Sequence, residues 1–246
     1  VILRYTMKYY EMHENAYQAL KKQGYVSWDR VKDVKELFVH SINKLLEQSL
    51  KDFFFSYQNL SVLDLGTGTG TVALFLANLG FKVSGFDVSK TAIEMAKVNA
   101  EKLNLNADFL VKDLNLLEVV EHYDFIVDSS FLHCIVPQIE RDQILSFVHQ
   151  SLNEDGLFFV HTMIQSSDMT KMLQGNDYLV LEDDILWSTG NKSWDMDWQI
   201  VKNKKVFPHR RIKSLDKIEE EFSRTNFAIM KKEIKYNKGY PSTYSA

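Results

Sequence analysis

The chain switches repeatedly between a strand-like and a helix-like pattern of apolar positions from residue 61 to about residue 163. Strand patterns lie at 61–65, 81–86, 107–111, 123–127 and 157–163, and helical patterns separate most of them. Strands that alternate with helices predict a parallel sheet with right-handed crossovers. The last of these strands is almost continuously apolar, which is typical of a central strand covered on both faces. We therefore expect a doubly wound α/β fold with helices on both faces of the sheet.

Two helices are predicted ahead of the first strand. The second, from Val34 to Leu46, has a core-facing stripe. The first ends at Gly24 and carries apolar and aromatic residues at helical spacing, which are Tyr10, His13, Tyr17 and Leu20. Either this helix packs on the core, or it forms a lid in which Tyr10, Tyr17 and the later Trp28 contact a substrate.

The pattern breaks from Gln165 to about Pro208 and resumes with a helix at 214–224 and a strand at 227–236. This insertion contains three tryptophans among many acidic residues. It forms either a cap that selects a cationic acceptor through contacts such as those of Trp187 and Trp194, or a small core of its own with a solvated acidic rim. Residues 240–244 read poorly as a strand because Pro241 cannot donate to a ladder.

The stretch 61–70 reads S-V-L-D-L-G-T-G-T-G, which predicts a strand, a tight loop and the start of a helix. Glycine allows a sharp turn and close approach of a ligand to the backbone. The helix that follows presents unpaired N–H groups that attract an anionic group. Asp87 ends the next strand pattern, where an acidic residue can accept hydrogen bonds from two ribose hydroxyls. The spacing G-x-G-x-G differs from the G-x-G-x-x-G of dinucleotide-binding folds.

This ordered set, followed by K-D-L-N at 112–115, resembles the class I, Rossmann-like S-adenosylmethionine-dependent methyltransferases. The resemblance implies a mostly parallel seven-stranded sheet and S-adenosylmethionine as the cofactor. It also implies that Asp113 lies against the adenine amino group, although K-D-L is equally a common turn or cap sequence. The expected cofactor-binding residues are Asp64, Gly66, Thr67, Gly68, Gly70, Asp87, Val88, Asp113, Leu114, Asp128 and Ser129.

The fourth strand enters D-S-S-F-L-H-C-I, and its carboxyl end is expected beside the cofactor. His133, His161 and His209 are candidate general bases because unperturbed imidazoles titrate near pH 6.5. We expect His133, His209 and Arg210 to be catalytic, with His133 favoured, and His161 to contact substrate. The D/N-P-P-aromatic motif of base methyltransferases is replaced by Ser129-Ser130, which argues against base methylation.

Composition narrows the class of protein further. The 246 residues contain no linker-like tract, so we expect a single domain, 1–246, with a helical lid at 7–57, a cofactor-binding core at 58–164, a cap insertion at 165–210 and a C-terminal helix and strand at 211–246. The net charge of −4 argues against a general nucleic-acid binder. A single cysteine, Cys134, excludes an intramolecular disulfide and a multi-cysteine zinc site, so we expect a cytoplasmic protein without a metal. No apolar run approaches ~20 residues, so no membrane span is expected.

The expected function is transfer of a methyl group from S-adenosylmethionine to an O, N or S atom of a small-molecule acceptor by in-line displacement. The stretch from 123 to 163 and the residues before the last helix look like those of small-molecule methyltransferases. One alternative is a protein or RNA methyltransferase that docks through the basic stretch 202–213, and another is a nicotinamide dehydrogenase or a catalytically silent nucleotide-binding module. The same basic stretch can also receive an anionic group of a substrate.

Overall fold

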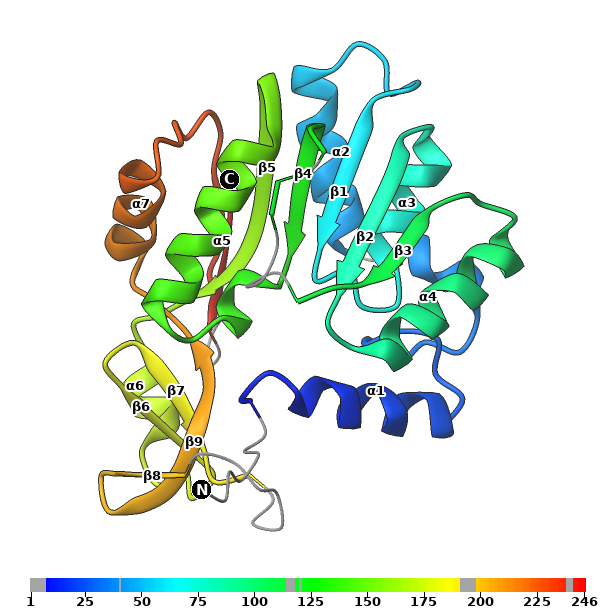
Figure 1. The fold of residues 1–246 in the computed structure, drawn as a ribbon. Coiled ribbons are helices and arrows are strands. Elements are labelled where there is room, and N and C mark those ends of the chain that lie inside the picture. Colours follow the sequence, from blue (N-terminus) through cyan, green and yellow to red (C-terminus); the bar gives the residue numbers. More distant parts are fainter. Residues whose placement is uncertain (1–7, 40, 114–117, 120, 191–197, 238–240) are drawn as a thin grey trace, which may run out of the picture.

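The fold is built on a seven-stranded, mostly parallel sheet (Figure 1). The computed structural model describes residues 8–246 except 40, 114–117, 120, 191–197 and 238–240. The strand order is β10-β11-β5-β4-β1-β2-β3, and only β11 runs antiparallel to its neighbours. This confirms the predicted Rossmann-like fold. The strands are β1 Ser61–Leu65, β2 Lys82–Asp87, β3 Asp108–Val111, β4 Tyr123–Ser129, β5 Leu152–Ile164, β10 Glu233–Lys235 and β11 Ser242–Ser245.

Helices cover both faces of the sheet, because the apolar side chains along each strand point alternately to one face and to the other. Val62 packs into one core cluster together with η1 and the helices α2, α3 and α4, whereas its neighbour Leu63 packs into another with α5. Side chains of successive strand residues point to opposite faces, so each strand contributes to both cores. The helical segments are α1 Met12–Lys22, η1 Val34–Val39, α2 Ser41–Phe53, α3 Thr71–Leu79, α4 Lys90–Leu103, η3 Leu132–Cys134, α5 Gln138–Ser151, α6 Met169–Leu173 and α7 Leu215–Arg224.

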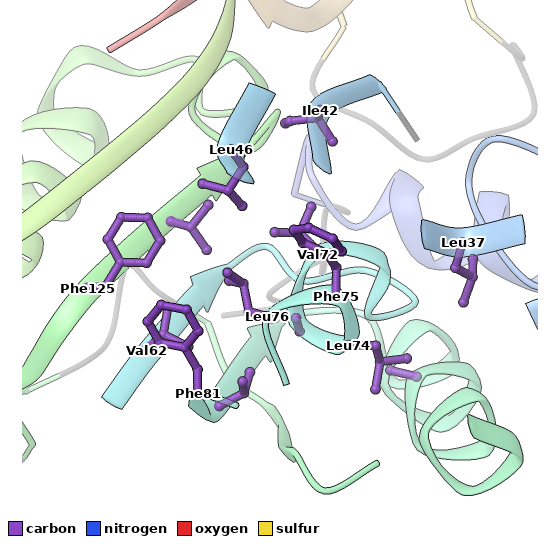
Figure 2. Close-up of a cluster of buried hydrophobic side chains, with 14 of the residues drawn as sticks. Leu37, Ile42, Leu46, Val62, Val72, Leu74, Phe75, Leu76, Phe81 and Phe125 are labelled. Atoms are coloured by element: carbon purple, nitrogen blue, oxygen red, sulfur yellow. The ribbon is translucent and has the colours of Figure 1, made fainter. Parts of the chain in front are cut away.

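The larger core lies between α3 and the sheet and is closed by α2 and η1 (Figure 2). Leu74 and Leu76 of α3 and Leu46 of α2 are completely buried. Phe81 and Phe125 come from the sheet side and pack with their ring centroids 6.2 Å apart. This packing fixes α3, and with it the glycine loop from which α3 begins.

The predicted helix from Val34 to Leu46 is in fact two pieces, the 3-10 helix η1 and the α-helix α2. Asn43 holds the corner between the two pieces, because its buried side-chain amide donates a hydrogen bond to the main-chain carbonyl of Leu37 at 3.0 Å. A buried polar group of this kind satisfies a backbone acceptor that an uninterrupted helix would have satisfied itself.

The C-terminal prediction was wrong in two respects. The strand expected at 227–236 is reduced to β10, and the segment after Pro241, judged a poor strand, forms β11 in the interior of the sheet. Pro241 precedes the strand, so its missing N–H removes no ladder bond. Tyr244 of β11 is completely buried and stacks on Phe222 of α7, which gives the short strand its place in the core.

The insertion folds into a four-stranded antiparallel sheet of order β6-β7-β9-β8, preceded by α6. It has two small apolar clusters of its own, and β9 returns the chain to the main sheet. The main-chain N–H of Gln165 donates to the carbonyl of Lys213 at 2.9 Å, which holds the two ends of the insertion together. The strands are β6 Leu179–Glu182, β7 Ile185–Ser188, β8 Gln199–Val201 and β9 Lys204–Arg211.

Among the helices of the described ranges, none combines the length and apolar composition that a bilayer crossing requires.

The α2–α3 packing generates a stability prediction. Leu46→Ala should lower the free energy of unfolding by about 2 to 5 kcal/mol, since it removes buried methyl groups and leaves a cavity. The matched control is Leu110→Ala, because Leu110 is 44% exposed on β3 and should change stability by less than about 1 kcal/mol. Urea denaturation followed by circular dichroism measures both. Equal losses would mean that α2 does not anchor this core.

Candidate active site

A cavity of about 370 Å³ lies at the carboxyl ends of the central strands. Its walls come from the glycine loop after β1, the end of β2, the segment after β4, β5, and β9 of the insertion. The helix α1 lies across this edge of the sheet, and β9 lies at the same edge (Figure 1). The volume falls in the range of small-molecule sites. Of the residues expected from the sequence, those that line it are Tyr10, Tyr17, Trp28, Gly66, Thr67, Gly68, Asp87, Val88, Asp113, Ser129, His133, His161 and Arg210.

The glycine loop has the geometry that the sequence predicted. Gly66 and Gly68 have φ values of 61° and 54°, in the region that side chains disfavour. A Cβ at Gly68 would lie 2.6 Å from the hydroxyl oxygen of Tyr17, so α1 packs directly on the loop. Gly70 does not line the cavity; a Cβ there would meet the ring of Phe109 at 2.9 Å. Its role is therefore close packing of α3 against β3, as for the third glycine of dinucleotide-binding loops.

Asp87 lies at the cavity end of β2 and organises the loop. Its Oδ2 accepts the N–H of Gly68 at 2.9 Å, and its Oδ1 accepts the N–H of Ser89 at 2.8 Å. Burial raises the pKa of Asp87 to about 6, although these two N–H groups oppose the shift. Each carboxylate oxygen has a second lone pair, so Asp87 can accept further hydrogen bonds from a ligand in the cavity.

Asp64 and Asp128 lie behind the cavity wall rather than on it. Asp64 is completely buried and accepts the hydroxyl of Thr67 at 2.7 Å, while its Oδ1 has no partner among the described residues. Asp128 accepts the N–H groups of Phe131 and Leu132 at 2.6 and 2.8 Å. Burial raises the pKa of both carboxyls to about 7. Their contacts are with the loops that shape the site, and direct cofactor contact by either remains a prediction.

The adenine-side candidate, Asp113, also lines the cavity. Its Oδ2 accepts the hydroxyl of Tyr10 at 2.6 Å and lies 3.4 Å from the Lys8 ammonium. Burial and this hydrogen bond raise the pKa of Tyr10 to about 12, so its hydroxyl stays protonated. The structure thus joins Asp113 to the N-terminal segment. Leu114, the neighbouring candidate, lies outside the described residues.

The helix α1 is fastened over the site through Glu14. This carboxylate accepts hydrogen bonds from the Ser89 hydroxyl at 2.6 Å and from the main chain and hydroxyl of Thr91. It therefore occupies the N-terminus of α4, where a negative charge is stabilised. The opposite end of α1 is linked to α4 by Lys21 and Glu94 at 2.8 Å. Tyr10 and Tyr17 both line the cavity, but Tyr17 and Leu20 also pack against Ala92 of α4, so the helix makes core contacts and its role as a lid stays a prediction.

His13 was recognised in the sequence only as part of the helical stripe, not as a site residue. It lies in the cavity wall with its ring 5.8 Å from Trp28, and Trp28 also packs edge-on against Tyr17 at 5.3 Å. The spacing of Tyr10, His13 and Tyr17 on one helix face was the available signal. Cys134, which the sequence placed nearby without a role, also lines the cavity.

The wall formed by β4, β5 and β9 carries histidines and one arginine. His133 of η3 has its Nδ1 3.4 Å from the hydroxyl of Thr162, and His161 has its Nδ1 2.7 Å from the hydroxyl of Ser245. Burial, and then the charge of Arg210, lower the pKa of His133 well below its ordinary value and that of His13 to about 3. Both imidazoles are therefore neutral at physiological pH.

Besides Asp64, Gly70, Leu114 and Asp128, three further expected site residues are not part of the cavity wall as described, namely His209, Trp187 and Trp194. His209 does not line it, because successive strand residues point to opposite sides and Arg210 takes the inward position. Trp187 is buried beside Val180 and Val206 within the insertion, which is the small-core alternative rather than a cation-selecting cap. Trp194 lies outside the described residues. The described part of the chain contains no group of three or more histidine, cysteine or acidic residues placed to hold a metal.

Comparison with known proteins now decides the family. A family model described as a methyltransferase domain matches residues 56–234, most of the chain. This chain belongs to that methyltransferase family. The resemblance to class I S-adenosylmethionine-dependent methyltransferases is confirmed, and S-adenosylmethionine is the cofactor of this group.

Individual methyltransferases match over parts of the chain. The release factor glutamine methyltransferase of Bacillus subtilis is 28% identical over 183 residues, which are 71% of this chain and 60% of that protein. The ribosomal protein L11 methyltransferase of Dictyoglomus thermophilum is 30% identical over 142 residues, 56% of this chain and 43% of that protein. The chain spans between 42% and 60% of the length of such curated relatives.

Solved methyltransferase structures share the fold over nearly the whole chain. The magnesium protoporphyrin IX methyltransferase of Synechocystis PCC 6803, crystallised with S-adenosylhomocysteine, superposes with a TM-score of 0.64 at 15% identity and covers 96% of this chain and 94% of that one. A methyltransferase from Clostridium acetobutylicum gives 0.58 at 17% identity, with 97% and 98% covered. At these identities the likeness establishes the fold alone.

The residues present fit such a cofactor. The cavity brings the glycine loop, an acidic residue at the end of β2 and a second acidic residue after β3 into one enclosure. Asp87 keeps acceptor capacity, and the glycines at 66 and 68 have no Cβ, so neighbouring groups approach the loop backbone closely, as Phe131 and Tyr17 do.

The raised pKa of Asp64 generates a prediction about pH. Its folded-state value of about 7 lies above the ~3.9 of an unfolded aspartate, so folding favours the protonated form. The resulting stabilisation is fully present below pH ~4 and is lost as the pH rises through ~7. Asp64→Asn should therefore gain about 1 to 3 kcal/mol relative to wild type between pH 5 and pH 8, measured by urea denaturation.

Asp124→Asn is the matched control. Hydrogen bonds from Ser61 and Asn153 outweigh the opposing effect of burial and lower the pKa of Asp124. Asp124 stays ionised across pH 5 to 8 in both states, so its difference from wild type should be flat. A flat difference for Asp64→Asn as well would show that Asp64 is ionised in the folded protein.

Proposed function

We propose that the protein transfers the methyl group of S-adenosylmethionine to an O, N or S atom of a small-molecule acceptor. The observation that carries this proposal is that one cavity is lined both by the glycine loop and Asp87 and by Arg210 with the neutral imidazoles of His13 and His133. One end suits a nucleoside with an amino-acid tail, and the other leaves room for an acceptor.

In this proposal, residues that follow or end the three strands β1, β2 and β3 each contact a different part of the cofactor. Asp87 accepts hydrogen bonds from the ribose hydroxyls, and the loop at Gly66 and Gly68 passes closely beside the amino-acid portion. Asp113 lies toward the base. Thr67 is held by Asp64, so that loop is rigid before any ligand enters, which lowers the cost of binding.

The methyl transfer requires little general acid–base catalysis by residues of the chain. When bound, S-adenosylmethionine supplies a methyl group already activated by its sulfonium. The residues of the cavity then hold the acceptor in line and exclude water, and positioning of this kind can contribute ~7 to 11 kcal/mol. His133 is neutral and can accept a hydrogen bond from an acceptor O–H or N–H, which orients the lone pair. Because the pKa of His133 is lowered, its imidazole is a weak general base, so its main role is to orient the acceptor.

Two observations favour a small acceptor over a polymer. The cavity is covered by α1 and by the insertion sheet, both packed against the core. The basic stretch at 202–213 does not present a uniform cationic face: Lys202 pairs with Glu182, Lys204 with Asp177, and Lys213 with buried Glu221. Protein acceptors are named for some relatives, such as the release factor glutamine methyltransferase, so protein methylation is the alternative that the test must separate.

The test uses S-adenosylmethionine labelled in its methyl group, mixed with a cell extract separated into small-molecule, RNA and protein fractions. We expect label to enter the small-molecule fraction. Asp87→Ala should reduce the transfer at least tenfold, because the ribose and the loop both lose their acceptor. Asp108→Ala removes an exposed carboxylate at the start of β3 and should leave transfer unchanged. Label confined to protein or RNA would contradict the proposed acceptor, and undiminished transfer by Asp87→Ala would contradict its role.

A further inference from the structure

Two cations line the cavity among the described residues: Lys112 follows β3 and lies over the ring of Phe86, whereas Arg210 belongs to the wall formed by β4, β5 and β9, here called the acceptor wall. Its Nη1 donates to the main-chain carbonyl of His209 at 2.8 Å and lies 3.5 Å from Nε2 of His13. None of the ion pairs among the described residues involves its guanidinium. A guanidinium has five N–H donors, so the described residues leave most of its donor capacity unused.

The other cations of the same stretch are all engaged elsewhere. Lys205 lies over the ring of Trp198, 5.3 Å from its centroid, and Arg211 donates to the carbonyl of Val136 at 2.5 Å. Lys213 is buried against Glu221 at 2.8 Å. Arg210 differs from these neighbours because it alone of the four lines the cavity.

Three acids of the described residues line the cavity, which are Asp29, Asp87 and Asp113, and none of them forms an ion pair with Arg210. Asp87 is held by the main chain of the glycine loop, and Asp113 by Tyr10 and Lys8. The groups that surround Arg210 are neutral: His13 and His133 are deprotonated, and burial raises the pKa of the Cys134 thiol. The acceptor end therefore carries one uncompensated positive charge in a half-buried position.

From this arrangement we propose that the acceptor carries a carboxylate, which Arg210 binds while the neutral imidazoles of His13 and His133 flank it. The inference rests on the proposed function, since it assigns one end of the cavity to a methyl acceptor. Arginine suits this role because its planar fork matches the two oxygens of a carboxylate. A cationic acceptor would be repelled by the same charge.

Cys134 supplies a reporter for the charge at this site. It is the sole cysteine of the sequence and lines the same cavity wall, where the charge of Arg210 acts on its thiol. Iodoacetate and iodoacetamide attack the same thiolate and have nearly the same size, but only iodoacetate carries a carboxylate. The ratio of their alkylation rates cancels any change in thiol pKa and measures the attraction of the site for a carboxylate.

We expect Arg210→Gln to lower the iodoacetate-to-iodoacetamide rate ratio at least about fivefold, because the local positive potential is removed. Arg210→Lys keeps the charge and should retain the ratio within about twofold, which separates loss of charge from loss of fold. The matched control is Lys205→Gln, which removes a cation of the same strand outside the cavity and should leave the ratio unchanged. An unchanged ratio in Arg210→Gln would overturn the proposal.

The carboxylate of the cofactor is the competing source of an anion, and binding measurements separate it. S-adenosylhomocysteine has this group, whereas 5′-methylthioadenosine lacks it. If Arg210 serves the acceptor, Arg210→Gln should bind S-adenosylhomocysteine within about twofold of wild type by calorimetry. A selective loss for S-adenosylhomocysteine with methylthioadenosine unaffected would assign Arg210 to the cofactor and overturn the proposal. Failure of wild type to bind S-adenosylhomocysteine would instead refute the proposed function, whatever the alkylation ratio.

Discussion

The arrangement of the acceptor wall depends on one buried carboxylate, Glu221 of α7. It is completely buried and accepts hydrogen bonds from Arg141 of α5, from Lys213 beyond β9 and from Gln138. Burial opposes its ionisation, but the hydrogen bonds and charge of Arg141 outweigh burial and lower the pKa of Glu221 to about 2. Arg141 also donates to the carbonyls of Leu132 and Ile135, so the same cluster holds the segment that carries His133. Such a cluster is costly to desolvate and strongly destabilising when only one partner is lost, which ties α5, α7, η3 and β9 into one arrangement.

The consequence for the site is that its two ends are fixed by different means. The cofactor end is fixed by main-chain geometry: positive φ angles in the glycine loop and the Asp87 carboxylate that bridges Gly68 and Ser89. The acceptor end is fixed by side chains, through Glu221 and through Asp128, which holds the start of the His133 segment. The first kind of geometry is shared by proteins with the same cofactor. The second depends on this chain's own side chains, and in our proposal it selects the acceptor.

The same division explains what the sequence could and could not predict. The mostly parallel seven-stranded sheet, the glycine loop and the positions of Asp87 and Asp113 follow from local pattern and from the resemblance, and the family and fold are confirmed. The sequence could not show that Arg210 points inward and His209 does not, because that depends on the register of β9 against β7. The sequence could not decide between the two alternatives for Trp187, because its partners, Val180 and Val206, come from separate strands of the insertion. β11 was missed because its stability comes from Tyr244 packing on Phe222 rather than from strand propensity.

The most direct test of the central claim is the shift of the melting curve with S-adenosylhomocysteine, with NAD and ATP as controls. At ~100 times its dissociation constant, a ligand that binds only the folded state adds ~2.7 kcal/mol of stability. The cavity described here predicts a clear rise in melting temperature with S-adenosylhomocysteine and none of comparable size with the other two. A shift with NAD or ATP alone, or no shift with any of the three, would contradict the assignment of this cavity to S-adenosylmethionine.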